Sequence, residues 1–431
     1  MFLKLVLQTV LFQGSGYVMQ FIAFFLLARL LGAEDQGILT LFRTSGQIIT
    51  SVLWLGVTGG IFYYMGKDEE HLPSLLFNST AWFLSTSALF SAGLLLFTSI
   101  PIPALGTLKP YLPLFLAFIF FLGFFQLFES LSLSLKKYLA YNLFAFGLGL
   151  LLLAASVILF LLKDPTRKLF YSMAAYGISY ALVCAYGLLT IQRHKRKLSS
   201  AKKVKFFRQF STGLKGFISN LTGLLLFKLD LFFVGYFLTV RDVGIYSIAL
   251  FSAEMVTKIP YWSAGILTPI VASHEEGNVR KTLYMFYASL LVASVLGLFI
   301  TGLIAVFPHG VSSLAGRDFR GVEILILLLL PRVIMQSGVG ILAANLAGKG
   351  FPLWHPAGTL IGLVCLVPLD VLLIPRLGII GAPLANSLAF VSTLIVFVIG
   401  FKRYNHTAGI SFKVFTHDLK NRAIFVRKSN L

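Results

Sequence analysis

The chain has few cysteines and few charged residues. Only two of its 431 residues are cysteine, Cys184 and Cys365, and both lie inside apolar runs. This excludes a disulfide framework and a cysteine-based metal site. Charged residues make up 12% of the chain, against about 25% in an average soluble domain, so a water-soluble globular class is excluded. The sequence also lacks paired carboxylates, a nucleophile triad and a glycine-rich phosphate loop.

Apolar residues are abundant and occur in long runs. They make up 57% of the chain, and 42 residues are phenylalanine. A helix of about 20 apolar residues crosses a hydrocarbon core of roughly 30 Å. We therefore expect an all-α membrane protein with about twelve transmembrane helices. The expected spans lie near 6–31, 37–64, 75–99, 111–135, 138–162, 169–192, 212–237, 243–271, 282–306, 321–346, 353–374 and 378–400.

Positive charge is concentrated between the spans. The formal net charge is +20, and the segment 193–210 contains eight Lys or Arg and no acid. Because cytoplasmic loops are enriched in Lys and Arg, this pattern predicts that both termini are cytoplasmic. The same topology accounts for the basic excess without nucleic-acid binding. We expect a six-helix lobe at 1–192, a basic cytoplasmic linker at 193–210, a second lobe at 211–400 and a basic cytoplasmic tail at 401–431.

The two expected lobes resemble each other at one hairpin. A shift of 207 residues places 25–40 over 232–247. Phe25, Leu31, Asp35, Gly37 and Ile38 then match Phe232, Leu238, Asp242, Gly244 and Ile245. Two related six-helix halves have the same topology and enclose a cavity between them. This arrangement favours alternating access and therefore transport.

Polar residues inside the spans are candidates for the transport site, because ionisable groups within membranes usually face a cavity or a partner. Arg43, Gln47, Ser51 and Trp54 form one stripe on the second span. Under the shift, Gln47 corresponds to Glu254. We expect a cationic, phosphate-binding cavity, in which the substrate-binding candidates are Arg29, Arg43, Gln47, Lys215, Lys228, Glu254, Lys258 and Arg332.

Acids within the second half are candidates for ion coupling. Asp230 and Glu254 are the acids placed clearly inside these spans, and either is a candidate carrier of H⁺ or Na⁺. Asp230 is expected to meet a cation on a neighbouring span or to be hydrated near the outer interface. Glu254 and Lys258 stand four residues apart, so a structural ion pair is an equal alternative. Glu129 is expected to be solvated at the inner interface. We expect no other cofactor and no metal.

Three stretches carry a family resemblance. The first hairpin contains an A-R-x-L-G-x-x-x-x-G stretch, and 230–246 is similar to a D-x-x-x-x-G-Y-F-L…V-G-x-Y pattern. The segment 373–389 is similar to L-I-P-x-x-G-I-x-G-A-A-x-A-T, with Pro383 in place of an alanine. These stretches resemble the polysaccharide flippases of the multidrug/oligosaccharidyl-lipid/polysaccharide exporter superfamily. The matching residues are Ala28, Arg29, Leu31, Gly32, Gly37, Asp230, Gly235, Tyr236, Phe237, Leu238, Val243, Gly244 and Tyr246.

The resemblance implies a two-lobed transporter, built like the multidrug and toxin extrusion (MATE) proteins, that flips polyprenyl-pyrophosphate-linked oligosaccharide across the cytoplasmic membrane. It also implies frequent coupling to an ion gradient. The expected partners are the lipid-linked glycan, membrane lipids and a glycan polymerase or glycosyltransferases. The alternatives are a multidrug cation antiporter, whose cavity should be acidic, and a membrane-embedded polysaccharide polymerase or glycosyltransferase, which needs acid or base groups on outside loops. A structural scaffold would not explain the polar stripes in both halves.

Overall fold

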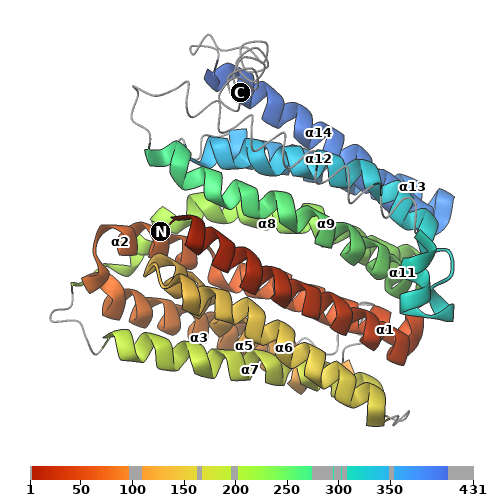
Figure 1. The fold of residues 1–431 in the computed structure, drawn as a ribbon, viewed down its shortest axis with the longest axis horizontal. Helices are drawn as coiled ribbons and strands as arrows, with labels where there is room; N and C mark the ends of the chain where they lie inside the picture. The colour runs from red at the N-terminus through yellow and green to blue at the C-terminus, as the bar shows by residue number, and fades with distance from the viewer. Residues whose placement is uncertain are drawn as a thin grey trace, which may run out of the picture. The chain divides into compact units, whose positions relative to one another are not determined.

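The structure is a computed structural model, and it describes residues 2–96, 109–162, 167–195, 202–273, 295, 302, 308–348 and 354–405. Within these ranges all regular secondary structure is helical (Figure 1). Eight of the described helical stretches are long and apolar enough to cross a membrane, which confirms the expected all-α membrane class. The expected span 282–306 lies outside the described residues except at 295 and 302, so the total of twelve stays a prediction.

The helices follow the expected spans closely. The described α-helices are α1 (Phe2–Trp54), α2 (Val57–Lys67), α3 (Leu72–Leu96), α5 (Leu112–Ser134), α6 (Tyr138–Leu162), α7 (Lys168–Lys195), α8 (Phe206–Phe237), α9 (Val240–Ser273), α11 (Pro308–Ala315), α12 (Val322–Gly348), α13 (Trp354–Leu377) and α14 (Gly381–Asn405). Short 3₁₀ turns are η1 (Glu69–His71), η2 (Lys109–Tyr111), η4 (Arg317–Phe319) and η5 (Gly378–Ile380).

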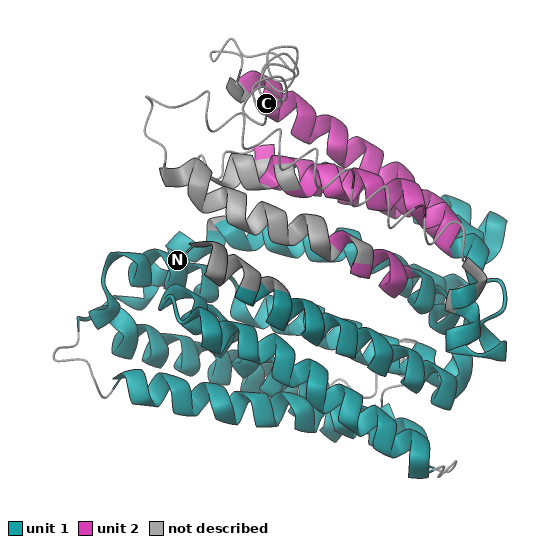
Figure 2. Ribbon diagram, viewed as in Figure 1, with its two compact units in different colours: residues 1–249, 309–325, 370–382 teal, residues 250–308, 326–369, 383–431 magenta. Residues whose placement is uncertain are grey.

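The chain divides into two compact units (Figure 2). Unit 1 comprises 1–249, 309–325 and 370–382, and unit 2 comprises 250–308, 326–369 and 383–431. The boundaries of the two expected lobes, 1–192 and 211–400, stay a prediction.

Two irregular points divide the first expected hairpin. At Gly32 the backbone leaves the helical region (φ 78°, ψ 176°), so α1 consists of one helical segment before this residue and another after it. The second expected span, 37–64, is also broken, because Leu55 and Gly56 have positive φ values of 43° and 84°. Glycine adopts such a conformation without steric penalty. The expectation of one continuous span from 37 to 64 is therefore wrong, and α2 begins directly after the break.

Aromatic side chains fill the core of unit 1. Phe42, Phe83, Phe115, Phe118 and Phe144 are all at most 1% exposed. The ring of Phe42 packs on the ring of Phe118 at 4.9 Å between centroids. This packing holds α1, α3, α5 and α6 together and explains much of the phenylalanine content.

The start of α9 crosses the second segment of α1 at very short range. A Cβ atom on Gly37 would lie 2.0 Å from the carbonyl oxygen of Val240, and one on Gly244 would lie 1.8 Å from that of Ala33. The shift of 207 residues converts Ala33 into Val240 and Gly37 into Gly244. Gly37 packs against Val240, and its counterpart Gly244 packs against Ala33, the counterpart of Val240. The two contacts are therefore equivalent under the repeat. A pseudo-twofold relation between two similar halves produces such a reciprocal contact.

Unit 2 is held together by contacts among α12, α13 and α14. The Ser387 hydroxyl donates to the carbonyl oxygen of Leu328 at 2.9 Å. The guanidinium carbon of Arg332 lies 5.2 Å from the centroid of the Phe390 ring, and Arg332 is completely buried. Gly358 on α13 faces the ring of Phe397 on α14.

Candidate functional site

A polar pocket lies at the break between α1 and α2 in unit 1. Its volume is about 230 Å³. The last turns of α1 contribute Ser51 and Trp54, two members of the polar stripe expected from the sequence. Opposite them, α5 contributes Gln126, Glu129 and Ser130, and α8 contributes Gly213, Gly216, Phe217 and Asn220. The pocket therefore combines amide, hydroxyl, indole and carboxylate groups within apolar helices.

Neighbouring helices fix the break in place. The carbonyl oxygen of Leu53, at the end of α1, accepts hydrogen bonds from the Trp82 indole at 3.0 Å and the Thr86 hydroxyl at 3.2 Å. On the other side, a Cβ atom on Gly56 would lie 2.7 Å from the carbonyl oxygen of Gly213. The backbone of α8 thus packs directly against the break. A broken helix at membrane depth is tolerated where its free polar groups are satisfied or line a cavity.

Trp54 is the most buried polar side chain of this pocket. It is 2% exposed, and its indole stacks on the Phe83 ring at 4.6 Å between centroids. Its Nε1 atom is buried and donates to none of the residues that the structure describes. A buried donor without a partner loses roughly 1–3 kcal/mol of stability, so a ligand acceptor at this point would bind favourably.

The pocket chemistry suits a neutral, hydroxyl-rich group. Gln126 and Asn220 both donate and accept hydrogen bonds, and Glu129 accepts them. Glu129 is the one ionisable residue among those that line the pocket. From the sequence, Glu129 is expected to be solvated at the inner interface, whereas in the structure it is half-buried in the pocket wall. The signal that was missed is the spacing of Gln126 and Glu129, which puts two polar groups on one face of a helix that is otherwise apolar.

Two buried carboxylates face each other elsewhere in unit 1. Asp230 on α8 and Asp370 on α13 are both 0% exposed, and each acts electrostatically on the other. Asp230 accepts hydrogen bonds from the Tyr246 hydroxyl at 2.5 Å and from the Leu231 backbone N–H at 2.9 Å. The oxygens of Asp370 accept none from the described residues. Buried carboxylates that lie near each other repel when both are charged, so this pair is a candidate for holding a shared proton or a bound cation.

This pair changes two expectations from the sequence. Asp230 is fully buried, which rules out hydration near the outer interface, one of the two alternatives expected for it; a cation on a neighbouring span stays a prediction. Asp370 was missed as a further acid, besides Asp230 and Glu254, within a span of the second half, although it lies in the expected span 353–374. The signal was present, because a single acid in a run of Leu, Val and Pro is costly in a membrane unless it has a function.

The remaining predicted residues do not gather in one described site. The Arg43 guanidinium lies 4.5 Å from the centroid of the Tyr176 ring and 5.6 Å from that of Phe24. Arg29 is exposed and lines a different pocket, near η4. Arg332 is buried inside unit 2. Gln47, Lys228 and Glu254 are half-buried, and the side chains of Lys215 and Lys258 lie outside the described structure. The expected cationic cavity stays a prediction.

No group of three or more His, Cys, Asp or Glu side chains comes together in the part of the chain that the structure describes. The Asp230–Asp370 pair is therefore the strongest candidate there for holding a coupled proton or sodium ion.

Sequence comparisons place the chain among known proteins. Residues 2–273 match a protein family described as "Polysaccharide biosynthesis protein". A protein of Haloferax volcanii named "Probable low-salt glycan biosynthesis flippase Agl15" is 24% identical over 227 residues, which are 52% of this chain and 47% of that protein. The chain thus spans about half the length of the curated relative it matches.

Solved structures share the fold. An inward-facing multidrug resistance MATE family transporter of the MOP superfamily has a TM-score of 0.69 and 14% identity, covering 94% of this chain and 99% of that chain. A MOP superfamily transporter from Pyrococcus furiosus, with a binding pocket of reverse polarity, has a TM-score of 0.66 and 14% identity, covering 93% and 95%. At these identities the likeness shows the fold alone, and it confirms the expected MATE-like architecture.

Proposed function

Because the chain belongs to the family of polysaccharide biosynthesis proteins, we propose that it is a flippase that moves lipid-linked oligosaccharide across the cytoplasmic membrane. The proposed substrate is a polyprenyl-pyrophosphate-linked glycan, and the proposed mechanism is alternating access. The proposed partners are membrane lipids and the glycosyltransferases or polymerase that make and use the glycan. The name of the Haloferax volcanii relative supports this assignment, and the MATE-like fold supports a transporter rather than an enzyme.

The observation that carries the proposal is the polar pocket at the α1–α2 break. Trp54, Gln126 and Asn220 offer hydrogen-bonding groups that match sugar hydroxyls. Its lining residues include a single acid and no base, so the pocket is suited mainly to uncharged groups of a ligand. A helix that is broken within its span is also a common way to build a substrate site in transporters. The glycan would enter here while its lipid tail remains in the bilayer.

The Asp230–Asp370 pair is the proposed site of the coupled ion. A buried pair of carboxylates can bind and release H⁺ or Na⁺ as its surroundings change. Movement of this ion down its gradient would then drive the empty protein back to the conformation that binds the next substrate. Glu254 remains a second candidate for this role.

A multidrug antiporter is the second candidate function, and one observation favours it. Glu129 and Trp54 line the same pocket, and a carboxylate beside an indole suits an organic cation. The two functions differ in what replacement of Glu129 does. Glu129→Gln should abolish transport of an organic cation, whereas it should leave most flipping of a neutral glycan intact.

The test uses purified protein in vesicles that contain a fluorescent polyprenyl-pyrophosphate-linked oligosaccharide. Flipping is measured as the fraction of label that becomes accessible to an external quencher. The double variant Gln126→Leu/Asn220→Leu removes two sugar-binding amides, and we expect its rate to fall by about tenfold or more. The matched control is Gln192→Leu, because Gln192 is exposed on α7 and lies outside the pocket. Equal rates for the double variant and the control would contradict the sugar-binding role.

A further inference from the structure

A second, larger pocket lies where α1 bends at Gly32. Its volume is about 570 Å³, which lies within the range of roughly 300–1,000 Å³ typical of small-molecule sites. Arg29 and Gly32 come from α1, and the other wall is the turn from α11 through η4. All the lining residues belong to unit 1. From the sequence, Arg29 is expected to line the cationic cavity, whereas no residue of 312–320 is among the predicted site residues.

The pocket carries an excess of positive charge. Arg29, Arg317 and Arg320 supply three guanidinium groups, and Asp318 is the one acid among the lining residues. None of these four side chains forms a hydrogen bond or ion pair with another residue in the described structure. The guanidinium donors are therefore available. Mutual repulsion among the arginines is relieved when an anion binds between them.

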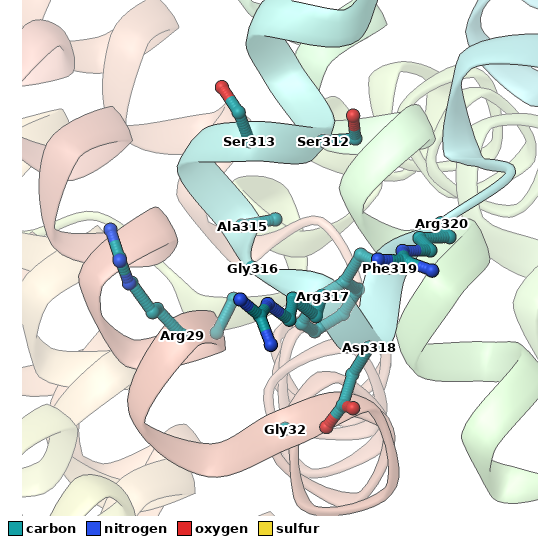
Figure 3. Close-up of a pocket in the computed structure, with 11 residues that line it drawn as sticks. Arg29, Gly32, Ser312, Ser313, Ala315, Gly316, Arg317, Asp318, Phe319 and Arg320 are labelled. Carbon is teal, nitrogen blue, oxygen red and sulfur yellow. The ribbon is translucent and has the colours of Figure 1, made fainter.

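The backbone positions these groups through two glycines. Gly32 has a φ of 78° and Gly316 has a φ of 109°, conformations that glycine adopts readily. A Cβ atom on Gly32 would lie 2.9 Å from an Asp318 carboxylate oxygen. In Figure 3 the Asp318 carboxylate points down toward Gly32, whereas Arg317 extends toward the α1 segment that carries Arg29. The acid thus lies against the bend at Gly32.

We propose that this pocket binds the phosphate groups of an anionic lipid head group, and that the pyrophosphate of the transported lipid is its main ligand. Guanidinium groups bind phosphate oxygens through two parallel hydrogen bonds. Ser312 and Ser313 add hydroxyl groups to the wall. This inference rests on the proposed flippase function and deepens it. The sequence predicts that this end of the helices faces outside, so the pocket would hold the head group as it leaves the carrier.

Binding of three probes tests the proposal. The protein is placed in neutral nanodiscs, and its affinity is measured for farnesyl pyrophosphate, for inorganic pyrophosphate and for phosphatidylglycerol added to the nanodisc. The variant is Arg29→Gln/Arg317→Gln. The matched control is Arg376→Gln, because Arg376 is an exposed arginine in the last turn of α13 and lies outside the pocket. We expect the double variant to bind farnesyl pyrophosphate at least about tenfold more weakly, while the control binds as the wild type does.

A variant with increased affinity distinguishes a phosphate-binding role of the pocket from a purely structural role. Asp318→Asn removes the acid that repels a phosphate, so we expect it to tighten binding by about threefold. Arginine-dependent binding of inorganic pyrophosphate as strong as that of farnesyl pyrophosphate would identify free phosphate as the ligand source. Arginine-dependent binding confined to phosphatidylglycerol would overturn the transported lipid as the main ligand. Equal affinities in the wild type and the double variant for all three probes would overturn the site.

Flipping measured on the same samples distinguishes this proposal from the proposed function. If the wild type flips the lipid-linked glycan and the double variant binds and flips equally well, the pocket proposal fails and the flippase function stands. If the wild type binds farnesyl pyrophosphate through its arginines but flips no glycan, the flippase function fails and the phosphate site stands.

Discussion

The crossing of α1 and α9 yields the sharpest structural prediction. In Gly244→Ala, the new Cβ atom would lie 1.8 Å from the Ala33 oxygen and 2.8 Å from the Ala33 carbonyl carbon. Ordinary contact begins at 3.4 Å, so the two helices must separate by on the order of 1.5 Å. Overpacking typically costs about 1–3 kcal/mol, and the upper end applies because the obstacle is backbone and has no alternative rotamer.

Two assays follow this variant. The free energy of unfolding, from a denaturant titration of the purified protein, should fall by about 2–3 kcal/mol. The flipping rate in vesicles should fall by tenfold or more, because a misplacement of about 1 Å can lower the rate of a step that depends on precisely positioned groups by roughly 100-fold. Gly37→Ala should behave similarly. The free energy of unfolding of the double variant should fall by less than the sum of the two single losses, because both substitutions separate the same two helices.

The control for this series is Gly177→Ala on α7. No heavy atom lies within 4 Å of a Cβ atom built on Gly177, so the substitution should be neutral or stabilising by about 0.5–1 kcal/mol. If Gly244→Ala is as stable and as active as Gly177→Ala, the close crossing is refuted.

Three further substitutions test other parts of the structure. Asp370→Asn should make flipping independent of an imposed H⁺ or Na⁺ gradient. The control Asp242→Asn, at the exposed start of α9, should keep this dependence. An unchanged gradient response in Asp370→Asn would exclude Asp370 from ion coupling. Trp82→Phe removes the indole hydrogen bond to the Leu53 oxygen and should lower the free energy of unfolding by about 1 kcal/mol, which a denaturant titration measures. The Lys202 ammonium and the Glu70 backbone N–H lower the pKa of Asp68, so this contact should stabilise the protein above the ordinary pKa of an aspartate and lose its effect as the pH falls through the lowered value. The Lys202 amide donates to the Glu70 oxygen at 3.0 Å, so its protection against hydrogen exchange, measured relative to the intrinsic rate at each pH, should decrease on acidification. In Asp68→Asn this protection should already be low at neutral pH.

Much of the fold could be predicted from the sequence because the membrane imposes simple rules. Apolar runs of about 20 residues must be helices there, and α5, α6 and α7 begin and end within a few residues of the expected spans. The break at Leu55 and Gly56 was not predicted, because Gly56 and Gly59 are compatible with a continuous membrane helix. The backbone of Gly213 on α8 packs directly against the break, and such a contact between distant segments has no local signal.

The candidate sites were predicted less completely for the same reason. The stripe of Ser51 and Trp54 was visible as a helical periodicity, but its partners Gln126 and Asn220 come from helices that are distant in sequence. Arg317 was not among the predicted site residues, because nothing in its sequence neighbourhood indicates that the bend at Gly32 lies beside it. Periodicity identifies the face of one helix, whereas a pocket depends on which faces meet.

The central claim is tested most directly by transport of two labelled substrates by the unmodified protein. Vesicles containing the protein are loaded with a fluorescent polyprenyl-pyrophosphate-linked oligosaccharide in one experiment and with a fluorescent organic cation in the other, alongside protein-free vesicles. The proposed function predicts that the lipid-linked glycan crosses the bilayer far faster than in protein-free vesicles, while the cation does not. Transport of the cation without movement of the glycan would contradict it.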